Sequence, residues 1–183
     1  MVVQSPSTNN IRTDPTAPLT GTSMTNQDEH FRRLERMYLA APANEYFRPE
    51  ITVGDGTAEV RLAVRPDFFH AASAVHGSVY FKLLDDATFF AASSLVPDVF
   101  VLTASFNIYF LRPISAGTMT ARGTIVSRST RLLIGEGVLT DAEGREIARG
   151  SGTFMPSRVP LDERVGYAGA GERGPGAGET ADN

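Results

Sequence analysis

The chain has 183 residues, of which 42% are hydrophobic, enough for one folded domain with a core. Its 17 Lys and Arg are outnumbered by 21 Asp and Glu, and the net charge of −4 argues against nucleic-acid binding. The absence of cysteine excludes disulfides, zinc-cysteine centres and thiol nucleophiles.

The N-terminus has no basic region followed by an apolar run, and no apolar segment is long enough to span a bilayer. We therefore expect a cytoplasmic protein that does not insert into membranes, and we expect no metal or cofactor. Residues 1–26 are rich in Ser, Thr, Pro and Asn, and residues 157–183 are rich in Gly. Both segments are predicted to be disordered tails, which leaves residues 27–156 as the folded domain.

Hydrophobic periodicity predicts an amphipathic helix first, a hairpin second, then a long helix and a series of strands. The helices are expected at 27–39, ended by Pro42, and at 77–95; the strands at 45–53, 57–64, 99–111, 118–127, 132–140 and 146–154. Residues 141–144 are typical of a hairpin turn. This order predicts an α+β domain in which a curved antiparallel meander wraps around one helix.

Two details of the strands carry expectations of their own. Strict alternation in residues 99–111 places Phe106 on one face, with Ala104, Ile108 and Phe110, and Thr103 on the other, with Ser105, Asn107 and Tyr109. Within the strand at 132–140, Gly135 and Gly137 suggest a bulge or bend.

The segment most suggestive of chemistry starts with His76-Gly77-Ser78 and continues into the long helix. The first turn of a helix has backbone N–H groups without intrahelical acceptors, which can stabilise a developing negative charge. A carboxylate in the same helix can supply a base. This pairing points to acyl-transfer chemistry.

Two adjacent carboxylates, Asp85 and Asp86, lie in the middle of this helix. At 100° per residue, the stripe expected on the sheet contains Tyr80, Leu83, Leu84, Ala87, Ala91, Ser94 and Leu95. Asp86 has Lys82, the only lysine of the chain, one turn before it and is predicted to form an ion pair.

Asp85 projects away from the stripe, between Phe81 and Phe89 at i−4 and i+4. Apolar neighbours raise the pKa of a carboxylate, so Asp85 is the candidate base. The alternative is a polar residue at a subunit contact. Because His76 and Asp85 are nine residues apart, they point to opposite sides of the helix, and both can reach one substrate only across a dimer axis.

These residues resemble the hotdog-fold acyl-CoA thioesterases of the PaaI-like group over residues 45–156. That group has an Asn, then His-Gly-Gly six residues later, then a catalytic Asp nine residues after the His. His76-Gly77 and Asp85 match this pattern, and the strand Thr103–Pro113 resembles a later signature. The chain departs from the pattern at His70, where the Asn is expected, and at Ser73 and Ser78, where Gly is expected.

The resemblance implies an acyl-CoA thioesterase in which the Gly77 N–H polarises the thioester carbonyl. Asp85 of the facing subunit would activate water or attack directly, and Thr103 would position the water. His76 would either donate to the ligand or hold the turn. His70 and Ser78 would contribute to substrate binding.

The remaining candidates concern the acyl-CoA substrate. Arg128 and Arg131 in a turn, and Arg112 at a strand end, are either phosphate clamps or solvated charges. Phe81 and Phe89, with Phe68 and Phe69, would line an acyl tunnel or belong to the core. The expected substrate carries a small aromatic or short to medium-chain acyl group, and the expected assembly is a homodimer or a dimer of dimers.

Three other interpretations stay open. The domain could bind acyl-CoA without catalysis, or it could be a hotdog hydratase or dehydratase, for which Asp67 and His70 are the only candidate pair. A purely structural protein would leave Asp85 unexplained.

Overall fold

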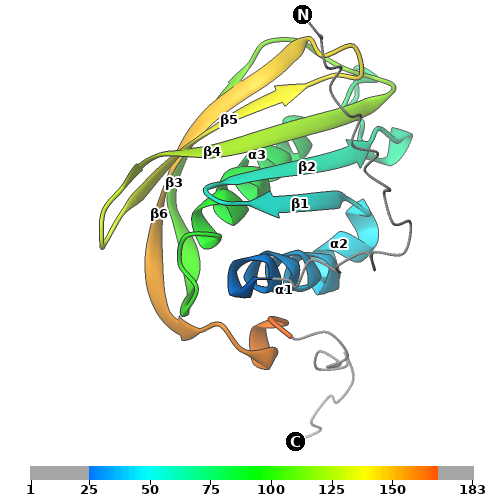
Figure 1. Ribbon diagram of the computed structural model, residues 1–183. Coiled ribbons are helices and arrows are strands. Elements are labelled where there is room, and N and C mark those ends of the chain that lie inside the picture. The colour runs from blue at the N-terminus through cyan, green and yellow to red at the C-terminus, as the bar shows by residue number, and fades with distance from the viewer. Residues whose placement is uncertain (1–24, 169–183) are drawn as a thin grey trace, which may run out of the picture.

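The computed structural model of the protein describes residues 25–168. Its elements are α1 (Asn26–Ala40), α2 (Pro42–Phe47), β1 (Glu50–Gly54), β2 (Thr57–Ala63), the 3-10 turn η1 (Pro66–Phe68), α3 (Gly77–Ser93), β3 (Val99–Phe110), β4 (Thr118–Arg128), β5 (Leu133–Thr140), β6 (Glu146–Pro160) and the 3-10 turn η2 (Glu163–Val165). The predicted α+β architecture, a curved antiparallel sheet around one long helix, is confirmed (Figure 1).

The six strands form one sheet in the order β1-β2-β4-β5-β6-β3, and neighbours are antiparallel. The predicted simple meander is wrong at one point, because β3 pairs with β6 and not with the strand that follows it. β3 thereby becomes an edge strand of the sheet, lying next to α3.

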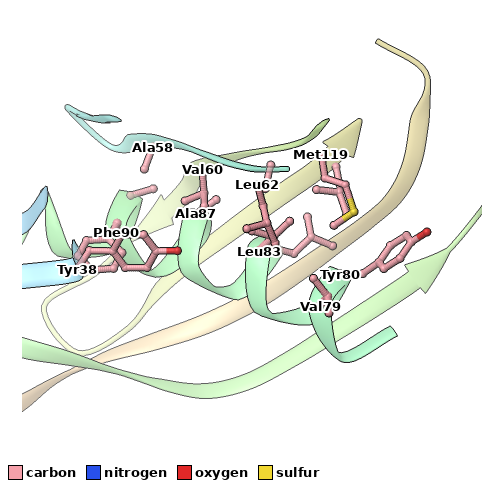
Figure 2. Close-up of a cluster of buried hydrophobic side chains, with 14 of the residues drawn as sticks. Tyr38, Ala58, Val60, Leu62, Val79, Tyr80, Leu83, Ala87, Phe90 and Met119 are labelled. Carbon is pink, nitrogen blue, oxygen red and sulfur yellow. The ribbon is translucent and has the colours of Figure 1, made fainter. Parts of the chain in front are cut away.

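Helix α3 lies against the concave face of this sheet and supplies much of the core (Figure 2). The predicted stripe is confirmed: Leu83, Leu84, Ala87 and Ala91 are fully buried, although Leu95 is only half-buried. Burying a leucine contributes about 1.5–3 kcal/mol. The sheet reaches the helix closely at Gly123, where a Cβ would collide with the Ala87 backbone.

A bulge lies beside Gly135, but its extra residue is in β4 and not in the strand that contains the two glycines. Ile125 pairs with Gly135 and Ser127 with Ile134, which leaves Val126 of β4 unpaired. A Cβ at Gly135 would lie 3.3 Å from the Thr88 side chain and a Cβ at Gly137 would lie 3.2 Å from it, both closer than ordinary van der Waals contact. These glycines therefore make room for α3.

The first strand begins later than predicted. Residues 42–47 form helix α2, with Pro42 at its first turn, and Arg48 ends it in a left-handed conformation with φ of 56°. Proline is favourable in the first helical turn, so Pro42 starts a helix in addition to ending one. Within the described residues, no helix is both long and apolar enough to cross a membrane.

The ordered chain also continues past residue 156, where the sequence places the start of a tail. β6 pairs with β3 as far as Pro160, and η2 follows. The Gly-rich composition that suggested a tail belongs mainly to later residues. The parts of the two predicted tails at 1–24 and 169–183 lie outside the described residues.

Candidate active site

The side chain of Asp85 meets Thr103 of β3 beside the middle of α3. The Thr103 hydroxyl donates a hydrogen bond of 3.0 Å to Oδ1 of Asp85. The other carboxylate oxygen, Oδ2, has no hydrogen-bond partner among the described residues. Thr103 therefore fixes the orientation of the carboxylate and leaves one oxygen available.

A β-bulge brings Thr103 to the helix side. The pairing of β3 with β6 shifts between Thr103 and Ser105, which adds one residue to β3. Phe106 nevertheless contacts α3 through the ring of Phe81, at 5.6 Å between centroids. Thr103 and Phe106 thus share the helix-facing side, and the predicted strict alternation is wrong at this point.

Asp86 has a different environment from Asp85. Its Oδ2 forms an ion pair of 2.7 Å with Nζ of Lys82, as predicted, and accepts a 2.7 Å hydrogen bond from the Tyr38 hydroxyl. Tyr38 is not predictable as a partner of Asp86, because a tyrosine in α1 carries no local signal that it reaches α3. Asp86 is thus engaged by two partners in a structural network.

Burial raises the pKa of Asp85 above the usual aspartate range. The hydrogen bond from Thr103 acts in the opposite direction, and the charge of the neighbouring Asp86 adds to the increase. Burial also raises the pKa of Asp86, against the effect of Lys82 and Tyr38. A carboxylate with a raised pKa is a stronger base, as the sequence predicts for Asp85.

Asp85 and Thr103 line a cavity of about 880 Å³ between α1, α2, α3 and β3. Its lining includes Phe89 and is mostly apolar, with Met37, Phe90, Phe100, Leu102 and Val165 among the side chains. Phe89 therefore lines this cavity, as expected, while also packing against Phe100 at 5.4 Å. Phe81, 41% exposed, is not part of its lining.

The first turn of α3 has free hydrogen-bonding capacity at Gly77. The Nδ1 atom of His76 accepts from the Ser78 N–H at 3.1 Å and lies 2.8 Å from the Ser78 hydroxyl, so His76 caps the helix. The Val79 N–H donates to the His76 carbonyl. Among the described residues, the Gly77 N–H has no acceptor, which suits it for binding an oxyanion.

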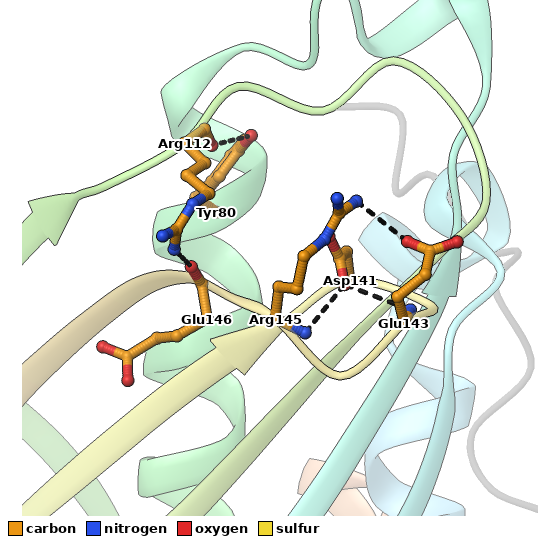
Figure 3. Close-up of polar contacts among 6 residues, drawn as sticks. All are labelled: Tyr80, Arg112, Asp141, Glu143, Arg145 and Glu146. Carbon is orange, nitrogen blue, oxygen red and sulfur yellow. Dashed lines mark hydrogen bonds and ion pairs between the residues drawn. The ribbon is translucent and has the colours of Figure 1, made fainter.

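Gly77 also lines a smaller cavity of about 310 Å³ together with His70 and Arg112. The Arg112 guanidinium donates to the Glu146 carbonyl, and the Arg112 carbonyl accepts from the Tyr80 hydroxyl (Figure 3). Nδ1 of His70 accepts from the Ala72 N–H at 3.0 Å. In a neutral imidazole the proton is then on Nε2, which leaves His70 a donor.

The two turn arginines predicted to bind phosphate lie at the other end of α3 from Gly77. Arg128 donates to the carbonyl of Leu95, and Arg131 belongs to the exposed turn that follows β4. The structure therefore does not bring them together with Gly77 in one protomer. The side chains of Asp67 and His70 form no hydrogen bond with each other among the described residues.

Comparison with known proteins supports one family. Residues 72–148 match the model of the thioesterase superfamily. The structure of the PaaI protein from the phenylacetic acid degradation operon of Escherichia coli is similar, with a TM-score of 0.68 and 18% identity over 74% of this chain and 99% of that one.

Two further proteins are similar. The thioesterase HI1161 from Haemophilus influenzae has a TM-score of 0.61 and 20% identity over 66% of this chain and 85% of its own. A candidate esterase of Saccharolobus solfataricus is 23% identical over 114 residues, which are 62% of this chain and 81% of that protein. At these identities the solved structures establish the fold, which confirms the hotdog prediction. The stretch that matches the thioesterase superfamily, residues 72–148, contains His76, Gly77, Asp85 and Thr103.

Proposed function

We propose that the chain is a cytoplasmic acyl-CoA thioesterase in which Asp85 is the base or nucleophile. The observation that carries the proposal is a carboxylate with raised pKa, oriented by Thr103, at the wall of a large apolar cavity. The match of residues 72–148 to the thioesterase superfamily supports the same chemistry.

In the reaction, Oδ2 of Asp85 takes a proton from water while the water oxygen attacks the thioester carbonyl carbon. The carbonyl oxygen becomes an oxyanion that the Gly77 N–H stabilises. The C–S bond then breaks, the carboxylic acid forms, and the coenzyme A thiolate leaves and takes up the proton. Direct attack by Asp85 would give an anhydride that water hydrolyses to the same products.

Gly77 and Asp85 of one chain cannot serve the same carbonyl, because eight residues of helix separate them by about 12 Å. We therefore propose a homodimer, alone or within a dimer of dimers, in which Gly77 of one subunit faces Asp85 of the other. Support comes from β3, an edge strand with exposed apolar side chains such as Leu102, Tyr109 and Phe110. Long apolar edge strands readily pair with another chain.

The small aromatic or short to medium-chain acyl group expected from the sequence fits within a cavity of this size. For the coenzyme A portion, Arg112 beside Gly77 is a candidate anion ligand, and Arg128 and Arg131 would act only from the partner subunit. The hydratase alternative has less support, because Asp67 and His70 do not form a pair.

The test is release of free thiol from a panel of acyl-CoA thioesters by wild-type protein, Asp85→Asn and Asp86→Asn. Since the chain has no cysteine, a thiol reagent reports only released coenzyme A. We expect Asp85→Asn to lose about 10²–10⁴-fold in kcat. Asp86→Asn serves as the matched control and should retain activity within a few fold, with a lower Tm because Lys82 loses its partner.

Thioester binding without turnover by the wild-type protein would instead favour the non-catalytic acyl-CoA-binding interpretation. An equal loss of activity in both variants, at matched folding by circular dichroism, would remove the special role of Asp85.

A further inference from the structure

Residues 161–168 form a short segment that follows β6 and crosses to α1 (Figure 1). The segment lies outside residues 72–148, the part matched to the thioesterase superfamily. It begins where the Leu161 N–H donates to the carbonyl of Asp98, in the connection between α3 and β3. It contains η2 and ends against α1.

Three contacts hold the far end of this C-terminal segment on α1. The Tyr167 hydroxyl lies 2.7 Å from Nδ1 of the buried His30, and the Arg33 guanidinium lies over the Tyr167 ring at 5.5 Å. Nε of Arg36 donates to the Ala168 carbonyl at 3.0 Å. Both ends of the segment are therefore hydrogen-bonded to other elements, which hold it against α1.

Gly166 allows the segment to turn close to the helix. Its φ of 81° lies in the left-handed region that favours glycine, and a Cβ there would lie 3.6 Å from Cα of Met37. This turn places Arg164, Val165 and Gly166 in the lining of the large cavity that also contains Asp85. Of these three, Val165 contributes an apolar side chain.

The size and polarity of the cavity indicate what it would hold. At about 880 Å³ it is near the upper end of ordinary ligand sites and much larger than a two-carbon acyl group needs. The charges of Lys82 and Asp86 are paired with each other. Of the other two carboxylates in the lining, Glu45 is exposed and Asp85 is oriented by Thr103, so Asp85 is the candidate for chemistry. Phe89 and Val165 line the same cavity as Asp85, so an apolar chain attached to a carbonyl beside Asp85 has apolar side chains to contact.

We propose that the C-terminal segment is a specificity wall, in which Val165 sets the largest apolar acyl group that the cavity accepts. This inference rests on the proposed function, because it assigns the cavity to the acyl group of the thioester. The proposed limit on acyl-group size would thus come from residues outside 72–148. Substrates with medium or longer apolar acyl chains should be preferred over acetyl-CoA.

The test changes the volume of residue 165 in the full-length chain. Val165→Phe should lower kcat/KM for dodecanoyl-CoA about tenfold or more relative to butanoyl-CoA, whereas Val165→Ala should shift the preference toward longer chains. The matched control is Val159→Phe, the same substitution on an exposed residue of β6 outside the cavity lining. Val159→Phe should retain the wild-type chain-length profile.

A second readout does not depend on hydrolysis. Binding of S-alkyl-CoA thioethers of the same chain lengths, measured by calorimetry, should show the same shift in length preference. If the wild-type protein hydrolyses thioesters but neither Val165 variant changes either profile, the specificity wall is refuted and the proposed function stands.

If the wild-type protein hydrolyses nothing but the thioether profile shifts with residue 165, the proposed function fails and the assignment of the cavity stands. If it neither hydrolyses thioesters nor binds thioethers, both are refuted. Should Val165→Phe fail to fold, Val165→Ala provides the test alone.

Discussion

The first turn of α3 and its middle differ in what they can contribute to a reaction. The first turn has a free N–H at Gly77, beside His70, Arg112 and a small cavity, and no described carboxylate lines that cavity. The middle has Asp85, oriented by Thr103, at a large apolar cavity. Each region has half of what thioester hydrolysis requires, and about 12 Å of helix separates them. The Gly77 N–H and the Asp85 carboxylate can act on one thioester only when two copies of the helix face each other.

After the loss of Asp85, the largest expected effect comes from removing the proposed oxyanion donor. Gly77→Pro deletes the N–H, and proline is tolerated at the first helical position, where His76 already has the extended backbone that precedes proline, with ψ of 142°. We expect kcat to fall about 10²–10³-fold. The measurement is steady-state thiol release with the best acyl-CoA.

Gly77→Ala is the control, since it adds a Cβ against the Phe110 ring but keeps the N–H. It should retain most of the activity. Equal losses in the Pro and Ala variants would mean that crowding at Phe110, and not the donor, explains the effect.

The proposed split of the site between subunits predicts recovery of activity on mixing. Asp85→Asn and Gly77→Pro are each expected to be nearly inactive as homodimers, but a heterodimer has one site with both groups intact. If subunits exchange randomly, a 1:1 mixture should reach about a quarter of wild-type activity, because half the dimers are mixed and each has one active site of two. Refolding the two variants together and assaying turnover makes the measurement.

Activity that stays at the sum of the two variants, with mixed dimers verified by mass spectrometry of tagged chains, would place the complete site within one subunit.

Substituting Thr103, the hydrogen-bond partner of Asp85, is expected to have a smaller effect on activity. Thr103→Val removes a hydrogen bond to the charged form of Asp85, so kcat/KM should fall about tenfold. The pKa of Asp85 should also rise further, because Thr103 opposes the effect of burial. Asp85 must be ionised to act, so activity is lost as pH falls, and the acid limb of the pH profile should move to higher pH in Thr103→Val.

Thr103→Ser keeps the hydroxyl, so the acid limb of its pH profile should coincide with that of the wild-type protein. An acid limb that is the same in all three proteins would show that the titrating group is not Asp85.

The smallest effect is expected at His76, where two roles were open. Because Nδ1 is engaged with Ser78, we expect a cap, and His76→Ala should cost about 1 kcal/mol of unfolding free energy and a few fold in activity. His76→Asn, which also caps helices, should restore both stability, measured by denaturant unfolding, and activity. If Asn restores stability but activity stays at the level of the Ala variant, the imidazole itself contacts the substrate.

Local patterns in the sequence determined the order of the strands and of the two longer helices, the buried stripe of α3 and the ion pair of Asp86 with Lys82. These features depend on helical spacing within one segment, so residue order is enough to predict them. The resemblance to hotdog thioesterases identified Gly77, Asp85 and Thr103 as candidates. The alternation in the strand, however, placed Thr103 on the face opposite Phe106, whereas both residues face the helix.

Only the tertiary structure decided that a bulge turns Thr103 toward Asp85, that Tyr38 joins the Asp86 network, and that residues 164–166 line the cavity. A bulge changes side-chain parity without a clear local signature, and the other two are contacts between segments far apart in the chain. Composition suggested a tail from residue 157, because it averages over a Gly-rich region and cannot detect that β3 offers a pairing partner as far as Pro160. Long-range packing, which no local pattern encodes, therefore completed the site.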